Sequence, residues 1–113
     1  MAEAAEIPVP MLFELCSGGT AYEAKPQIKT RIKLDTVLEA LRNHRGFEVL
    51  AYTPYMLIVK TPSGAEVSIT KRGKLIIKRV EREDEARTAA YDVLRIGASA
   101  IETVAPIKQK AAE

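Results

Sequence analysis

Several residue types that carry common protein chemistry are scarce in this chain of 113 residues. It has one cysteine, one histidine and no tryptophan, and aromatic residues make up only 5%. One Cys and one His cannot supply the usual four ligands of a structural zinc site, and one thiol cannot form an internal disulfide. The sequence therefore predicts no metal, no cofactor and a reducing, cytoplasmic compartment.

Long apolar runs and amide side chains are also scarce. No apolar run approaches the roughly 18 residues that a membrane-spanning helix requires, so no membrane association is expected. Asn occurs once and Gln twice, whereas 28% of the residues are charged. Few amides together with many charges are typical of proteins from heat-adapted organisms, which here points to a thermophilic source. With 47% apolar residues, the chain is long enough for one modest core.

Positive charge is concentrated in the middle of the chain. Residues 25–82 contain thirteen Lys and Arg against five Asp and Glu, although the whole chain has a net charge of only +2. The first 24 residues carry four Glu and no basic residue. Such a local excess is typical of proteins that bind a polyanion, most often the phosphodiester backbone of a nucleic acid. The alternative is a solubilising surface, although such surfaces usually intersperse both signs.

The hydrophobic pattern predicts an α+β fold: a single domain with an antiparallel four- to five-stranded sheet and two helices packed on one face. A short strand is expected at residues 11–16, a turn or loop at 20–26, and a half-buried strand at 27–34, where apolar and basic residues alternate. Four further strands are expected at residues 47–53, 55–61, 65–71 and 74–80. The turns between them are so short that neighbours must be antiparallel, which predicts a four-stranded meander.

Two helices are expected, one before and one after the meander. The first begins at Asp35 or Thr36 and stops at Gly46. The second begins near Glu81 or Arg82, and small or apolar residues spaced by four and three continue as far as Val104. A helix this long outruns the sheet, so its last turns are expected to pair with a second protomer in a homodimer.

These elements define the expected domain limits. The α+β domain, ending in the long helix, spans residues 11–105. A mobile arm is expected at residues 1–10 and a polar tail at residues 106–113.

Alternation along the strands assigns their side chains to two faces. One face is continuously apolar, and the helices are expected to cover it. It comprises Ile28, Ile32, Leu34, Phe47, Val49, Leu57, Val59, Val67, Ile69, Leu75 and Ile77. The other face combines cations with more apolar groups than a simply solvated surface carries. An apolar strip rimmed by cations suits a single-stranded nucleic acid, because bases lie on the strip while phosphates meet the rim.

The candidate binding residues lie on this second face. The expected phosphate contacts are Lys29, Arg31, Lys33, Lys60, Lys71, Arg72, Lys74, Lys78 and Arg79. The expected base-stacking and apolar platform is Tyr52, Tyr55, Leu50, Met56, Ile58 and Ile76, and Tyr22 and Phe13 are the next candidates for stacking. A duplex hides its base faces, so this platform favours single-stranded DNA or RNA.

Other functions stay open at this point. The same face is also suited to dock an acidic protein or a second copy of the chain, and a duplex DNA binder is a further alternative. Cys16-Ser17-Gly18-Gly19 lacks the following helix and Lys of a phosphate-binding loop. A catalytic thiol needs a base, and His44 is the only histidine. We therefore expect a protein without enzymatic activity and without a small-molecule substrate.

Several short segments resemble known DNA-binding families. The expected order of elements is similar to one repeat of the TATA-box-binding protein fold, and residues 72–77 and 83–86 resemble its last strand and acidic helix start. Cys16-Ser17-Gly18-Gly19, residues 29–35 and Thr53-Pro54-Tyr55 resemble the ThermoDBP family of single-stranded DNA-binding proteins from heat-loving archaea. This second resemblance covers roughly residues 11–94. It implies a basic, partly apolar cleft for single strands and dimers formed through a C-terminal helix.

Overall fold

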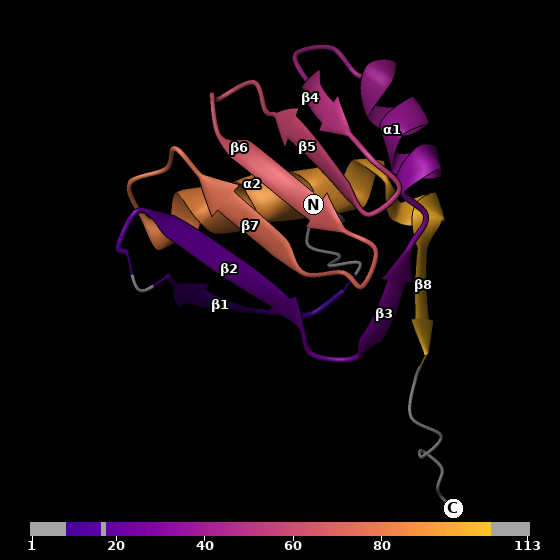
Figure 1. Cartoon of the computed structure of the whole chain (residues 1–113). Coiled ribbons are helices and arrows are strands. Elements are labelled where there is room, and N and C mark those ends of the chain that lie inside the picture. Colours follow the sequence, from indigo (N-terminus) through magenta and orange to yellow (C-terminus); the bar gives the residue numbers. More distant parts are fainter. Residues whose placement is uncertain (1–8, 17, 105–113) are drawn as a thin grey trace, which may run out of the picture.

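A six-stranded antiparallel sheet forms one layer of the fold, and two helices cover one of its faces (Figure 1). The computed structural model describes residues 9–16 and 18–104. In chain order the elements are β1 (Met11–Leu15), β2 (Ala21–Pro26), β3 (Lys29–Ile32), α1 (Leu34–Arg42), β4 (Glu48–Tyr52), β5 (Met56–Lys60), β6 (Glu66–Thr70), β7 (Leu75–Lys78), α2 (Glu83–Ile96), the short 3₁₀ helix η2 (Ala98–Ala100) and β8 (Ile101–Val104). The large sheet has the order β1-β2-β7-β6-β5-β4, and β3 pairs with β8 in a separate two-stranded sheet. The expected α+β class is confirmed, with more strands than the four or five predicted.

Strands β4 to β7 form the meander that the sequence predicts. Each pairs with the next in antiparallel register. Alternation holds across it: Val59 lies opposite Val67, which lies opposite Ile77, and all three are fully buried. Gly64 and Gly73 occupy two of the turns with φ of +96° and +95°, a left-handed conformation that favours glycine.

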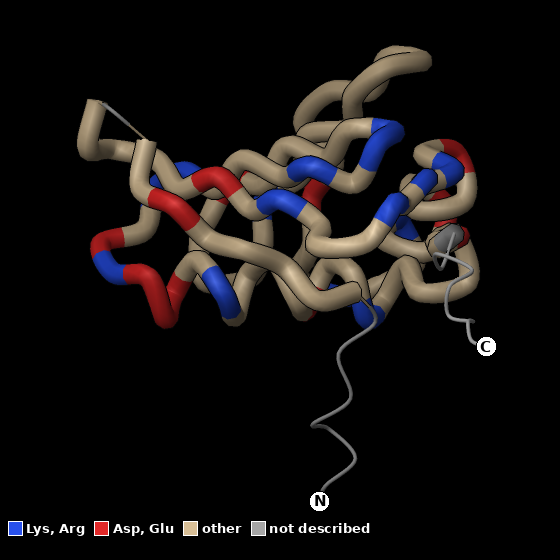
Figure 2. Tube along the Cα trace, turned by 90° about the horizontal axis from the view of Figure 1, so that it is seen from below, with Lys and Arg blue, Asp and Glu red and all other residues tan. Residues whose placement is uncertain are grey.

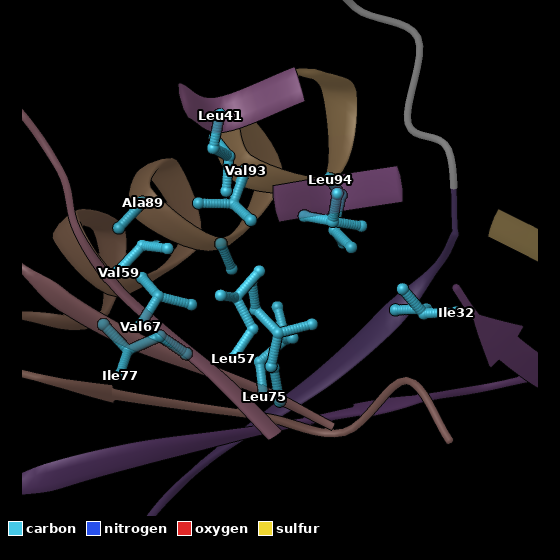
Figure 3. Packing of buried hydrophobic residues seen from close by; sticks show 14 of the residues in the cluster. Ile32, Leu41, Leu57, Val59, Val67, Leu75, Ile77, Ala89, Val93 and Leu94 are labelled. Atoms are coloured by element: carbon cyan, nitrogen blue, oxygen red, sulfur yellow. The ribbon is translucent and has the colours of Figure 1, made fainter. Parts of the chain in front are cut away.

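Buried side chains from the sheet and both helices form one hydrophobic core (Figure 3). Leu57 from β5 belongs to the same cluster as Leu41 of α1 and Val93 of α2. Each such burial contributes about 1.5–3 kcal/mol relative to leaving the side chain exposed. Val9, from the predicted arm, also belongs to this core and is only 1% exposed. Residues 1–8 of that arm and the predicted tail at 106–113 lie outside the described residues.

Both helices begin near the predicted positions. Four buried residues at helical spacing form the stripe of α1: Leu34, Val37, Leu38 and Leu41. At the start of α2 the Glu85 carboxylate accepts hydrogen bonds from the backbone N–H groups of Glu81 (2.7 Å) and Arg82 (3.4 Å). This contact satisfies donors that the first helical turn leaves unpaired, and it stabilises the predicted start. Within the described part of the chain, neither helix has the length and apolar character needed to cross a membrane.

Two expectations about the first third of the chain are wrong. Residues 21–26 form β2 rather than a loop, because this segment pairs with β1 on one side and with β7 on the other. The strand predicted at 27–34 is shorter, and it leaves the large sheet to pair with β8. The pairings of β2 with β7 and of β3 with β8 are long-range in sequence, so local alternation does not reveal them.

The expected long C-terminal helix is also wrong. Helix α2 ends at Ile96, and the chain continues through η2 into β8. The helix ends at its C-cap Gly97, and glycine is a weak helix former. Helix α1 also packs closely at this point, since an added Cβ would lie 3.1 Å from a Val37 methyl carbon. The residues expected to offer a helical seam to a second protomer therefore form a strand that pairs with β3 of the same chain.

Candidate nucleic-acid interface

A groove of about 1150 Å³ lies where β3 approaches the turn between β6 and β7. One wall is the end of β2 with β3, and the other is the β6–β7 turn with Tyr55 from the β4–β5 turn. The lining residues are Pro26, Gln27, Ile28, Lys29, Thr30, Arg31, Tyr55, Thr70, Lys71, Arg72 and Lys74. Five of them are Lys or Arg, and none of these described lining residues is acidic. We call this feature the basic groove.

The two walls of the basic groove are joined by one hydrogen bond and one close contact. The Ile32 backbone N–H donates to the Lys71 carbonyl oxygen at 2.8 Å. Thr30, which is 8% exposed, packs directly on Gly73: a Cβ added to Gly73 would lie 3.0 Å from the Thr30 Cβ. Because Gly73 also has a left-handed φ, glycine is required at this position on two counts.

Four of the five cations that line the basic groove are accessible to a ligand. Lys29, Arg31, Lys71 and Arg72 are exposed, and none forms an ion pair with a described acidic residue. Figure 2 shows this concentration as blue segments close together on its right side, whereas most red segments lie to the left. Unpaired cations on two facing walls produce a positive potential that attracts a polyanion.

The fifth cation, Lys74, is held by an acidic residue outside the groove lining. Its Nζ lies 2.8 Å from Glu23 Oε2, and Glu23 Oε1 lies 3.9 Å from Lys25 Nζ. The hydrogen bond from Lys74 holds the pKa of the Glu23 carboxyl below its ordinary value, helped by the charges of Lys74 and Lys25 and opposed by partial desolvation. Lys74 is therefore partly neutralised in the unliganded protein.

Tyr55 presents an aromatic ring at the groove. It is 72% exposed, the most accessible of the large hydrophobic side chains in the described chain. The Thr53 hydroxyl holds the turn, because its oxygen accepts hydrogen bonds from the backbone N–H groups of Tyr55 (3.2 Å) and Met56 (3.1 Å). Lys71 Nζ lies 5.7 Å from the centre of the Tyr55 ring. A stacking surface and a phosphate-binding group thus lie next to each other.

The expectation that Tyr52 shares the outer sheet face with Tyr55 is wrong. A bulge between Val49 and Ala51 shifts the register of β4, so that Tyr52 lies opposite Leu57, a fully buried residue of the helix-covered side. An extra residue in a strand reverses the alternation beyond it. Leu50, at the bulge itself, is 45% exposed on this edge strand.

The remaining predicted phosphate contacts lie outside the basic groove and close to acidic residues. Across the outer sheet face, Glu66 lies opposite both Lys60 and Lys78, and Lys60 lies opposite Glu48. Arg79 Nε lies 3.7 Å from the Glu66 carboxylate. Lys33 Nζ lies 3.5 Å from the carboxylate of Glu102, which stands opposite Arg31 in the β3–β8 pair. The sequence predicted a single cationic, partly apolar face, but the structure has two separate surfaces. On the outer sheet face positive and negative charges are balanced, and only the basic groove carries an excess of positive charge.

Part of the predicted apolar platform lies where alternation placed it. Ile58 and Ile76 are half-buried on the outer sheet face, on either side of Ser68 in register. Met56 is half-buried and lies opposite Thr70, which lines the groove. These side chains form an apolar strip that leads from the groove across the outer face.

The other aromatic residues and the candidate thiol are not part of this site. Phe13 is buried against Tyr91, with ring centres 5.7 Å apart, and Tyr22 is half-buried on the core side. Cys16 follows β1 and His44 follows α1, and the ends of these two elements lie on opposite sides of the fold (Figure 1). No cluster of three potential metal ligands occurs among residues 9–16 and 18–104.

Sequence reasoning missed several residues of the groove. Gln27 and Thr30 had no expected role. Ile28 packs against the core as expected, but it is only half-buried and also lines the groove. No local pattern marks these positions, because the walls come from segments about forty residues apart in the chain. Comparison with protein-family models, with curated proteins and with solved structures gave no significant match.

Proposed function

We propose that this protein binds single-stranded nucleic acid, with DNA favoured and with little sequence preference, and that it is not an enzyme. The observation that carries the proposal is the basic groove, in which five cations and one exposed tyrosine line about 1150 Å³ without a described acidic residue. Lys29, Arg31, Lys71 and Arg72 contact backbone phosphates, and Tyr55 stacks on a base. Phosphate contacts position a strand but carry no sequence information, which accounts for the low specificity.

The preference for a single strand rests on Tyr55 and on the apolar strip beside it. A stacking residue is useful only where a base face is open, and a duplex hides these faces. Met56, Ile58 and Ile76 continue the apolar surface away from the groove, so bases beyond Tyr55 lie against them. Stacking tolerates every base, because each base has a π face.

Two of the segments that resemble ThermoDBP-type proteins agree with this proposal. Residues 29–35 include β3, and Thr53-Pro54-Tyr55 forms the turn that carries the exposed ring. Both lie at the basic groove, which is the kind of partly apolar, basic cleft that the resemblance implies. A cytoplasmic compartment fits as well, since the single cysteine is present as a free thiol.

The proposal is tested by fluorescence anisotropy with labelled oligothymidine, oligouridine and a DNA duplex of equal length. We expect both single strands to bind more tightly than the duplex. Replacing Tyr55 by Ala should remove about 1–3 kcal/mol of binding free energy for the lost base stack. Tyr52→Ala is the matched control, because Tyr52 is an exposed tyrosine on the other side of the sheet. Duplex binding at least as tight as single-strand binding would contradict the proposal and favour a duplex DNA binder.

A second candidate is a protein-interaction module that uses the outer sheet face to bind a second copy or an acidic partner. It is favoured by Ile58 and Ile76, which are only partly covered on a face that neither described helix, α1 or α2, packs against. Light scattering of Ile58→Ser and Ile76→Ser separates the two candidates. An interface predicts dissociation of a dimer in these variants, whereas nucleic-acid binding predicts an unchanged oligomeric state and weaker oligothymidine binding.

A further inference from the structure

One carboxylate, that of Glu23, lies next to the basic groove and holds one of its five cations. Glu23 stands on β2 opposite Ile76 of β7, and its side chain is 23% exposed. Its carboxylate lies 2.8 Å from Lys74 Nζ, the shortest ion pair that any groove cation makes within the described chain. Among residues 9–16 and 18–104, the other four lining cations have no acidic partner.

We propose that Glu23 competes with the ligand for Lys74 and thereby sets the affinity of the basic groove. In the free protein Glu23 withholds Lys74 from the groove, and on binding Lys74 exchanges the carboxylate for a backbone phosphate. This inference rests on the proposed function and adds a residue that regulates it.

The surroundings of Glu23 make this exchange feasible. Lys25 Nζ lies 3.9 Å from the second Glu23 oxygen, so Glu23 keeps a cationic neighbour when Lys74 leaves. Lys25 is itself 3.5 Å from Glu14, which completes a chain of alternating charges along the outer face. The Lys74 side chain is 46% exposed on a flexible four-carbon stem, and the groove that it lines is adjacent.

A carboxylate at this position lowers affinity because the charged contact must be broken before the phosphate contact forms. Exposed ion pairs contribute modestly to free energy, so removing this one should tighten binding by about two- to fivefold. Gln is the suitable replacement, since it keeps the size of Glu23 and its uncharged amide oxygen accepts a weaker hydrogen bond from Lys74 than a carboxylate does.

The experiment measures oligothymidine affinity at low salt for wild type, Glu23→Gln, Lys74→Gln and the double variant. We expect Glu23→Gln to tighten binding in the wild-type background and to have no effect in the Lys74→Gln background. Glu66→Gln is the matched control. Glu66 also lies on the outer face with its side chain 23% exposed, and it pairs with Arg79 rather than with a groove cation. Glu66→Gln removes the same charge and should change affinity by less than Glu23→Gln.

Each result decides between the alternatives. Tighter binding of Glu23→Gln that disappears without Lys74 supports the inference. An effect equal to that of Glu66→Gln, or one that persists in the Lys74→Gln background, shows a general response to net charge and overturns the inference alone. A wild-type protein that binds neither oligothymidine nor oligouridine refutes the proposed function, and the inference fails with it.

Discussion

The salt dependence of binding offers the sharpest test of the basic groove. Four lining cations, Lys29, Arg31, Lys71 and Arg72, form no ion pair with a described acidic residue. If each of these four, and Lys74 once it has exchanged Glu23 for a phosphate, neutralises one phosphate of a single strand, the logarithm of the binding constant should fall with the logarithm of salt concentration with a slope of about −3.5. Replacing Lys71 and Arg72 by Gln should reduce the slope to about −2.1.

The same variant should also bind more weakly at moderate salt. At 0.1 M salt each phosphate contact contributes about fivefold relative to 1 M, so losing two contacts weakens binding about 25-fold. The fold should be preserved, because the contact between Lys71 and Ile32 is made by the backbone carbonyl. Anisotropy titrations of labelled oligothymidine between 50 and 200 mM salt measure both quantities.

Lys60→Gln with Lys78→Gln provides the matched control. It removes the same number of positive charges from the outer sheet face, where Glu66 lies opposite both lysines. The groove predicts a nearly unchanged slope for this control. If both double variants reduce the slope equally, binding responds to net charge alone, and the assignment of phosphates to the groove is wrong.

Three further predictions concern stability. Gly73→Ala should lower the free energy of unfolding in urea by about 2–4 kcal/mol, because an alanine would adopt a left-handed φ and press on Thr30. Gly64→Ala should lower it by only about 1–2 kcal/mol, because an added Cβ at Gly64 has no neighbouring atom within 4 Å and only the left-handed φ is unfavourable. Equal losses would show that the contact with Thr30 is unimportant. Arg79→Gly should raise the free energy of unfolding by about 0.5–1 kcal/mol, since Arg79 has a φ of 63°, and a decrease would contradict this reasoning. The pKa of Glu23 is lowered in the folded state, so its contribution to stability is present above the ordinary value of 4.5 and is lost as pH falls through the lowered value. In Glu23→Gln the melting temperature should therefore fall less steeply on the acid side than in the wild type. An identical acid dependence of the melting temperature in both proteins would refute the effect.

Local pattern was sufficient for the elements whose partners are close in the chain. The meander from β4 to β7 follows from alternation such as that of Leu57 and Val59, and from turns too short to allow any other arrangement. The start of α2 follows from an acidic first turn with Glu85 placed to accept backbone hydrogen bonds. In both cases the stabilising contact lies within a few residues.

The hydrophobic pattern gave wrong predictions where contacts with a distant segment of the chain determine the structure. The spacing of small residues up to residue 104 suggested one helix, but α2 ends at its C-cap Gly97, and the chain continues into β8, which pairs with the distant β3. Residues 21–26 are too polar to predict a strand, yet they lie between β1 and β7. No sequence pattern predicts the bulge next to Ala51 either, and this bulge moves Tyr52 to the opposite side of the sheet from Ile58.

The order of residues alone thus establishes an antiparallel α+β domain with a surplus of cations in its middle, because hydrophobic alternation and charge counts are local properties. Whether those cations act together is a long-range matter. The fold brings β3 to the β6–β7 turn through Thr30 and Gly73, which gathers five of the cations around one groove and leaves others beside carboxylates. Electrostatic potential depends on distances in space, so only the assembled tertiary structure separates a basic groove from an ordinary charged surface.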